Sequence, residues 1–222
     1  MIHAWQKRLL NNKPVFIREY NTPGEYDVSV DAGVYEGWLI GAGAGGAILN
    51  NIRTTGKTYA QGGVGGTLHV RFTVPERTTI KITVGARGIN SASTYTGSGV
   101  SATATAGGDS YITGLANTTM QAGGGTHAQV VSTSSTSASG TAGLQGTNTA
   151  VGDNILAILA DNATVIKSAT ATSTATRRTP TGAANLNWLE KTSTGAGGDL
   201  GWDGNNILNR LAGQGFVRIY AI

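Results

Sequence analysis

The glycines near residue 41 have the types and the spacing of a nucleotide-binding site. In the stretch GWLIGAGAGGAILN, residues 37–50, Gly41, Gly43 and Gly46 match the pattern G-x-G-x-x-G and follow an apolar run. Glycines in this pattern permit a tight turn and a close backbone approach to pyrophosphate, whose charge then lies at the N-terminus of the next helix. The pattern therefore raises the hypothesis of a dinucleotide-binding enzyme.

The residues after these glycines do not complete such a site. Residues 47–56 include two Asn, two adjacent Thr and a Gly, which are all poor helix formers. A dinucleotide site also needs an acidic residue about 20 positions further on to bind the ribose, and no Asp or Glu lies between Glu36 and Glu76. We therefore expect no cofactor, and we expect these glycines to pack against other parts of the chain.

The histidines form no recognisable catalytic or metal site. His3, His69 and His127 have no second histidine or carboxylate at a ligand spacing, and the chain has no cysteine. His69 alternates with Leu68 and Val70, so we expect it to project away from their apolar face into solvent. The sequence thus predicts a protein that is not an enzyme and that has no catalytic or metal-binding residues.

Glycine dominates the composition. The chain has 34 glycines among 222 residues, and only 13% of its residues are charged, against about 25% in ordinary globular proteins. Because glycine loses the most backbone entropy on folding, a folded chain of this composition needs extensive backbone hydrogen bonding and close chain approach. The net charge is +4, but the basic residues form no stripe and no long apolar run exists, so we expect neither nucleic-acid binding nor membrane insertion.

Alternating apolar residues predict strands over much of the chain. The expected strands are residues 15–20, 25–30, 34–40, 67–74, 78–84, 110–113 and 215–222. Residues 67–74 and 78–84 are expected to pair as an antiparallel hairpin through Pro75, and Trp38 is expected in the core.

Other segments predict helices and loops. Residues 153–160, after the possible cap Asp153, and residues 183–189 are candidate short helices. The Ser/Thr-rich segments 132–141 and 168–176 are expected to be loops. At the N-terminus, four apolar residues have near-helical spacing and indicate an amphipathic helix or an anchoring arm: Ile2, Trp5, Leu9 and Leu10.

The order of the glycine clusters resembles that of a known family. The clusters are 41–46, 62–66, 83–88, 107–112, 122–125 and 213–220. This order resembles the glycine-rich domain of bacteriophage tail and tail-fibre proteins over roughly residues 25–222. The resemblance implies a mostly β fold: a β-sandwich-like frame with glycine-rich extended, polyglycine II-like tracts and long Ser/Thr/Gly loops.

Such tracts are physically reasonable. An extended three-residue helix has no internal hydrogen bonds, so its neighbours must provide them, and chains without Cβ atoms approach closely enough for Cα–H···O contacts. The glycines expected to pack in this way are Gly41, Gly43, Gly45, Gly46, Gly62, Gly63, Gly65, Gly66, Gly123, Gly124 and Gly125.

We expect residues 1–20 to form an N-terminal anchoring or assembly arm and residues 21–222 to form the glycine-rich β domain. Aromatic residues in Gly- and Asn-rich loops, Tyr95, Trp188 and Trp202, are candidates for surface recognition. The alternative is that these tryptophans fix loops onto the frame.

These observations predict a virion structural protein, a phage tail or tail-fibre component that acts in host-receptor binding or tail-tip assembly. A bacterial extracellular adhesin or matrix protein is the alternative, and a dinucleotide-binding enzyme is a weaker one. The expected partners are other tail or fibre proteins, a host-surface glycan or protein, and further copies of the chain, with a trimer favoured. Because no signal peptide is recognisable, the expected location is the virion tail, which becomes extracellular on lysis.

Overall fold

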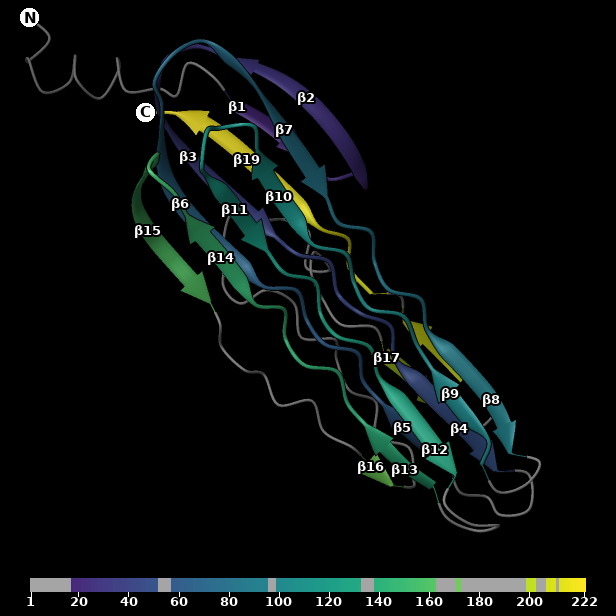
Figure 1. Cartoon of the computed structure of the whole chain (residues 1–222). Coiled ribbons are helices and arrows are strands. Elements are labelled where there is room, and N and C mark those ends of the chain that lie inside the picture. The colour runs from purple at the N-terminus through teal and green to yellow at the C-terminus, as the bar shows by residue number, and fades with distance from the viewer. Residues whose placement is uncertain are drawn as a thin grey trace, which may run out of the picture.

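The computed structural model describes residues 17–51, 57–95, 99–132, 138–162, 171–172, 199–202, 207–210 and 212–222. Within these residues the chain forms strands and extended segments and no helix. The prediction of a mostly β, sandwich-like fold is confirmed. The strands fall into two tiers, joined by extended tracts (Figure 1).

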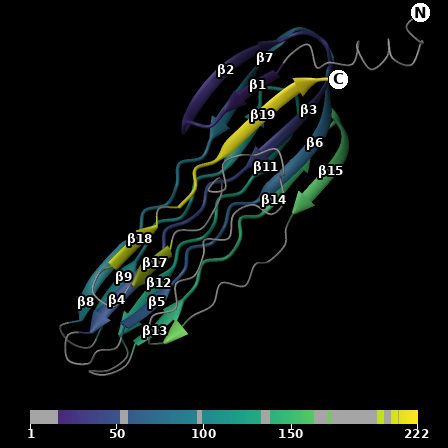
Figure 2. The ribbon, with the colours of Figure 1, turned by 180° about the vertical axis from the view of Figure 1, so that it is seen from behind.

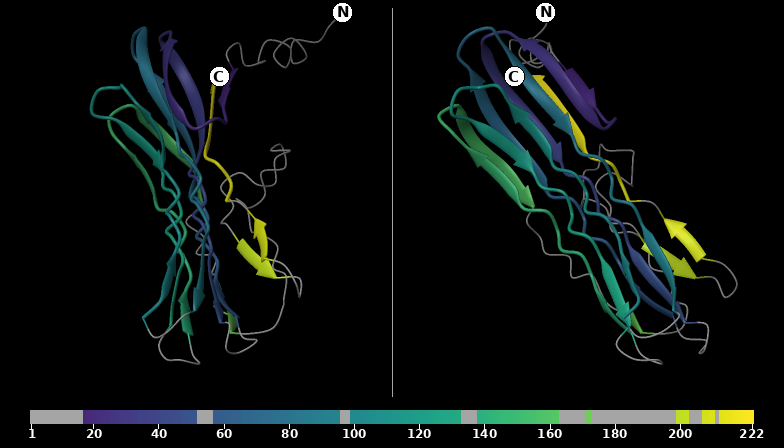
Figure 3. Two further views of the ribbon diagram at one scale, coloured as in Figure 1. Left: turned by 90° about the vertical axis from the view of Figure 1, so that its right-hand side faces the viewer. Right: turned by 45° about the vertical axis from the view of Figure 1, so that its right-hand side comes forward.

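The first tier, which we call the frame, consists of two five-stranded antiparallel sheets that face each other (Figure 3). One sheet has the order β1 (Ile17–Tyr20), β19 (Phe216–Ala221), β3 (Gly33–Ile40), β6 (Thr67–Val74) and β15 (Ile155–Asn162). The other has the order β14 (Asn148–Val151), β11 (Thr119–Ala122), β10 (Ser110–Thr113), β7 (Thr78–Val84) and β2 (Gly24–Val30). We call them the first and the second frame sheet.

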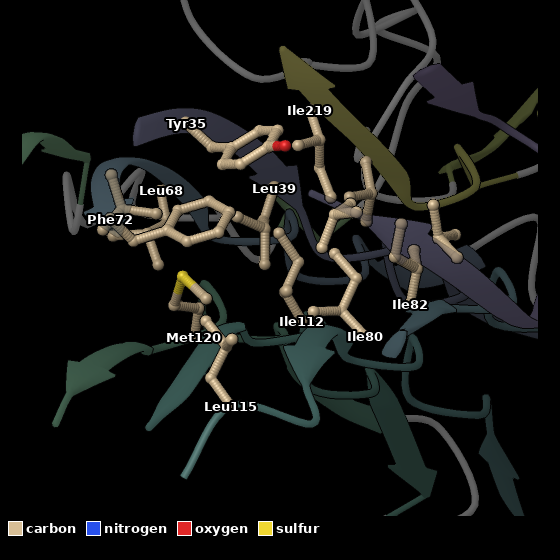
Figure 4. Packing of buried hydrophobic residues seen from close by; sticks show 14 of the residues in the cluster. Tyr35, Leu39, Leu68, Phe72, Ile80, Ile82, Ile112, Leu115, Met120 and Ile219 are labelled. Carbon is tan, nitrogen blue, oxygen red and sulfur yellow. The ribbon is translucent and has the colours of Figure 1, made fainter. Parts of the chain in front are cut away.

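The core lies between the two frame sheets. Its largest fully buried side chains include Leu39 and Phe72 from the first sheet and Ile80, Ile82 and Met120 from the second (Figure 4). Alternation explains this arrangement, because every second residue of β6 and β7 is apolar and points to the same side. Burial of each such side chain contributes about 1.5–3 kcal/mol.

The predicted hairpin between residues 67–74 and 78–84 is wrong. Both segments are strands, but β6 pairs with β3 and β15, whereas β7 pairs with β2 and β10. The connection through Pro75 carries the chain from one sheet to the other. Each strand has one apolar face, and two such faces cover each other when they stack across a sandwich but not when they lie edge to edge.

The second tier, which we call the distal sheets, is smaller. One sheet has the order β13 (Ala138–Thr141), β12 (Gln129–Ser132) and β9 (Ser101–Thr103), and a second has the order β16 (Ala171–Thr172), β5 (Lys57–Ala60), β4 (Ala47–Asn51) and β8 (Ser91–Tyr95). A hairpin of β17 (Asp199–Trp202) and β18 (Ile207–Arg210) lies outside β4 and β5 (Figure 2). The distal core consists mainly of small side chains: Ala47, Leu49, Ala60, Ala102, Ala104, Ala128 and Val130.

Two further expectations need correction, and a third is not tested. Residues 153–160 do not form a helix, since Ile155–Asn162 is strand β15, which gains its backbone hydrogen bonds at the free edge of β6. The Ser/Thr-rich segments contain short strands: Ser132 ends β12, β13 lies within the first segment and β16 within the second. Residues 183–189 lie outside the described residues.

Candidate functional site

Extended tracts of six residues connect the frame with the distal sheets. They are residues 41–46, 61–66, 85–90, 104–109, 123–128 and 142–147, and a further tract is described at 212–215. Each begins where one strand ends and leads into a strand of the other tier, so the chain crosses repeatedly between the tiers (Figures 1 and 3). Six residues of a three-residue helix with a rise of about 3.1 Å extend about 19 Å, or about two turns.

The tract 41–46 lies at the centre of this bundle. All six of its amides donate to other parts of the chain: Gly41 to Gly66, Ala42 to Gly108, Gly43 to Gly213, Ala44 to Gly63 and Gly45 to Thr105, each at 2.9 Å, and Gly46 to Asn90 Oδ1 at 2.7 Å. Gly41 and Ala44 both donate to tract 61–66, and Ala42 and Gly45 both donate to tract 104–109, as expected for three residues per turn. Tracts 85–90 and 123–128 donate to tract 41–46, through Gly88 to the carbonyl oxygen of Gly43 and Gly125 to that of Ala42.

The tracts approach so closely that side chains would not fit between them. A Cβ atom on Gly41 would lie 2.0 Å from the carbonyl oxygen of Gly123, and one on Gly65 would lie 1.8 Å from that of Gly41. A Cβ atom on Gly125 would lie 2.1 Å from the carbonyl oxygen of Gly63. All eleven glycines that the sequence analysis selected for packing lie in the tracts 41–46, 61–66 and 123–128.

This geometry leaves the G-x-G-x-x-G pattern without the features that bind pyrophosphate. Phosphate binding would need free amides at the start of a helix. The amides of residues 41–46 already have protein acceptors, and strand β4 follows the pattern. The glycines hold a backbone bundle together.

A polar cluster lies on the outer face of the first frame sheet. Glu36, only 7% exposed, accepts hydrogen bonds from His69 Nε2 at 2.9 Å, from Arg71 Nε at 3.0 Å and from the Tyr220 hydroxyl. The ring of Trp38 stacks on His69 with centroids 3.8 Å apart. Neighbouring strands β3, β6 and β19 bring these residues together.

The ionisation of the cluster follows from its burial and hydrogen bonds. Burial raises the pKa of Glu36, but the hydrogen bonds from Tyr220, Arg71 and His69 outweigh it, so the pKa lies below its ordinary value. Burial lowers the pKa of His69 more than Glu36 raises it, so at pH 7 this contact is a hydrogen bond that neutral imidazole donates to the Glu36 carboxylate. Burial and the bond to Glu36 raise the pKa of Tyr220 to about 12. Both carboxylate oxygens of Glu36 have donors, so the arrangement braces three strands.

Two expectations about this face need correction. Trp38, expected in the core, lies on the outer face, because it alternates with the buried Leu39 along β3. His69 projects away from the apolar face as predicted, yet it is bound to Glu36 and covered by Trp38. Sequence reasoning missed the cluster because its members come together only through the pairing of β3 with β6 and β19.

The longest connection joins two strands of the distal tier. Turns between frame strands comprise residues 21–23, 31–32, 75–77, 114–118 and 152–154. Connections between distal strands comprise residues 52–56, 96–100, 133–137, 173–198 and 203–206, most of which lie outside the described residues. The turns between frame strands thus have two to five residues, and the connections between distal strands have four or five, except for the 26 residues of segment 173–198.

Two of the three candidate recognition residues occupy distal strand ends. Tyr95 is the last residue of β8, which continues tract 85–90 away from the frame. Trp202 is the last residue of β17, which runs antiparallel to β18 and so also runs away from the frame. Trp188, like Trp5 and His3, lies outside the described residues.

No family model matches the chain, and no curated protein matches its sequence. The described part of the chain contains no helix that is long and apolar enough to cross a membrane. It also contains no group of three or more His, Asp or Glu side chains that could hold a metal ion.

Proposed function

We propose that this protein is a structural component of a bacteriophage tail or tail fibre that holds recognition loops at a distance from its attachment point. The observation that carries the proposal is the division of the connections between the two ends. The frame end carries turns of two to five residues, whereas the distal strands are connected by segments 52–56, 96–100, 133–137 and 203–206 and by the much longer segment 173–198. Loops held on a hydrogen-bonded support are a common arrangement for binding surfaces.

The surface composition supports binding outside a cell rather than binding to nucleic acid. From Gly88 to Ile166 the chain has no Lys or Arg, and Ser and Thr are abundant. On the distal sheet of β13, β12 and β9, the side chains of Ser101, Thr103, Ser139 and Thr141 are wholly or partly exposed. A neutral, hydroxyl-bearing surface suits a glycan or the polar surface of a protein.

The bundle of tracts supports a spacer role. Backbone hydrogen bonds such as those from Gly41 to Gly66 and from Ala42 to Gly108 do not depend on loop side chains. Loop sequences at the distal end can therefore change while the support stays the same. This property suits a receptor-binding component whose target differs between hosts.

Adsorption to bacterial cells tests the proposal. The wild-type protein is applied to a panel of bacterial strains and isolated surface glycans, and the best target is then used with the variants Tyr95→Ala, Trp188→Ala and Trp202→Ala. Loss of a central aromatic contact should weaken binding by about 2 kcal/mol, roughly thirtyfold. The matched control is Trp38→Ala, since Trp38 stacks on His69 in the frame and should leave adsorption unchanged.

Three outcomes would count against the proposal. The wild-type protein binds no target in the panel, Trp38→Ala loses as much adsorption as the distal variants, or the distal variants adsorb normally but melt at a lower temperature. The last result would identify the distal aromatic residues as structural. A separate test of location is to label virions with an antibody against the chain, which should decorate the tail. A rise in melting temperature of several degrees with millimolar NAD would instead favour the dinucleotide-binding enzyme.

A further inference from the structure

Exposed apolar side chains gather where β14 and β15 lie side by side at one edge of the frame (Figures 1 and 3). Val151 at the end of β14 is 58% exposed, and Leu156, Ile158 and Leu159 of β15 are 53%, 50% and 41% exposed. We call these four residues the apolar edge. Single exposed apolar residues are common, but four of the seven exposed large apolar side chains of the described residues lie on these two adjacent edge strands, and such a concentration at open sheet edges indicates a contact surface.

The pairing of β15 explains why its leucines are exposed. Among the described strands, β15 is the last of its sheet, and β6 alone pairs with it. The register shifts between Ile155 and Ala157 and again between Ile158 and Ala160. Leu156 and Leu159 are the residues that these shifts leave without a partner in β6. Both large apolar side chains therefore lie at an edge with which no other strand of the described residues pairs.

The charges around the apolar edge are acidic. Asp153 in the preceding turn and Asp161 near the end of β15 are both exposed, and Asp161 accepts a hydrogen bond from Asn148 Nδ2 at 2.7 Å. The nearest described cation on β6 is Arg71, opposite Ala157, and its guanidinium is bound to Glu36. A partner for this edge should be apolar with basic residues beside its apolar positions.

A second copy of β15 does not meet that requirement. Antiparallel pairing of two β15 strands about Ala157 would bring Asp153 of one copy opposite Asp161 of the other. Like charges directly opposite each other destabilise a strand pair. Symmetric pairing of two apolar edges in this register is therefore disfavoured.

The N-terminal residues of the chain have the complementary composition. Residues 1–16, which lie outside the described residues, contain the apolar Ile2, Trp5, Leu9 and Leu10 and the basic Lys7, Arg8 and Lys13. The first acidic residue of the chain is Glu19. The segment thus combines the apolar and basic character that the apolar edge requires.

β1 begins at Ile17 and lies at the opposite edge of the same sheet from β15 (Figure 1). Strands spaced by about 4.8 Å place these two edges about 19 Å apart, and sixteen residues reach up to about 50 Å when extended. The segment can therefore reach the apolar edge of its own copy or that of another copy, and the mass of the wild-type protein distinguishes the two contacts. We propose that the N-terminal segment of one copy binds the apolar edge of the next copy. Such a head-to-tail contact uses two different surfaces, and it closes into a ring when the rotation between copies allows.

Two full-length variants test the contact from its two sides. Leu156→Ser/Leu159→Ser removes the apolar edge, and Leu9→Ser/Leu10→Ser removes the apolar part of the N-terminal segment. Analytical ultracentrifugation should find an assembly of the wild-type protein and an association constant about thirtyfold lower for each double variant. The control is Ile89→Ser, because Ile89 is 68% exposed on tract 85–90, away from the apolar edge, and its loss should leave the mass unchanged.

A mixing experiment shows whether the two surfaces bind each other across copies. Each double variant keeps one of the two surfaces, so an equimolar mixture should form a species of two chains while each variant alone stays monomeric. Circular dichroism and melting curves check that each variant is folded. A wild-type protein that is monomeric at tens of micromolar, double variants that assemble like the wild type, or a mixture that stays monomeric would each overturn the proposal.

Discussion

A single methyl group in the glycine bundle should destabilise the whole protein, and Gly41→Ala is the sharpest place to add it. The Cβ atom of alanine would lie 2.0 Å from the carbonyl oxygen of Gly123, 2.4 Å from its carbonyl carbon and 2.8 Å from the carbonyl oxygen of Ala122. All of these are backbone atoms, which cannot rotate away. To reach even 3.0 Å, the shortest separation that real Cβ atoms tolerate, tract 123–128 must move by about 1 Å.

The expected loss of stability follows from the hydrogen bonds that this movement disturbs. Gly123 accepts from the Gly66 amide at 2.7 Å and donates to the carbonyl oxygen of Thr147 at 2.9 Å. Two buried backbone groups left without partners cost about 1–3 kcal/mol each, and the lower entropy of unfolded alanine offsets about 0.4–1 kcal/mol. The net loss is about 1–5 kcal/mol, which lowers the melting temperature by about 2–20 °C in a chain of this size.

Gly33→Ala is the matched control. Gly33 lies in β3 like the residues just before Gly41, but its added Cβ would meet only Tyr35 Cε2 at 3.6 Å, an ordinary contact. Its stability should change by less than about 1 kcal/mol. Differential scanning calorimetry compares the two variants with the wild type. If Gly41→Ala melts within about 2 °C of Gly33→Ala, the close packing of tracts 41–46 and 123–128 is refuted.

Two further predictions concern polar residues. Burial lowers the pKa of His69 below 6.5, so as the pH falls the unfolded state binds this proton before the folded state does. The free energy of unfolding, measured with urea, should therefore decline as the pH falls below about 6.5. His69→Gln should flatten this decline and leave only the loss below about pH 4.5, which comes from the lowered pKa of Glu36. Parallel curves of stability against pH for the wild type and His69→Gln would contradict this prediction. The second prediction concerns Asp109, whose Oδ2 accepts from the Tyr111 hydroxyl at 2.7 Å and from Gln121 Nε2 at 2.8 Å, and whose Oδ1 accepts from the Gly124 amide at 2.6 Å. Asp109→Ala should therefore lose about 2 kcal/mol in thermal unfolding, with Asp109→Asn intermediate, and equal stability of all three proteins would show that these bonds contribute nothing.

Local alternation predicts strands well because it depends only on neighbouring residues. Residues 67–74 and 78–84 form β6 and β7 with the expected bounds. The same pattern could not predict their pairing, since alternation reveals which face is apolar and says nothing about which edge meets which strand. The apolar run from Ile155 to Leu159 fits a short helix or a strand equally well, and the free edge of β6 decides in favour of β15.

For the candidate site residues, too, the sequence could predict some features and could not predict others. The packing of the tract 41–46 glycines against other tracts is expected because a continuing helix and an acidic residue are absent, and that inference needs only the sequence. The partners of Glu36 lie on β6 and β19, and no sequence spacing connects residue 36 with residue 220. The size of Trp38 favours the core, whereas its position next to Leu39 in an alternating strand assigns it to the other face.

The two tiers are stabilised by different interactions, and this difference explains why the distal sheets depend on the tracts. The frame buries large side chains such as Phe72 and Met120, whereas the distal core consists mainly of alanines and would gain little from burial alone. Tract 41–46 makes backbone hydrogen bonds along its length and leads from the frame into β4. These bonds hold the distal strands in register with each other. Stability therefore resides in the frame, and the distal sheets depend on the tracts for their geometry. A substitution in a distal loop leaves both the frame core and the backbone bonds intact, while a substitution at Gly41 disturbs both tiers at once.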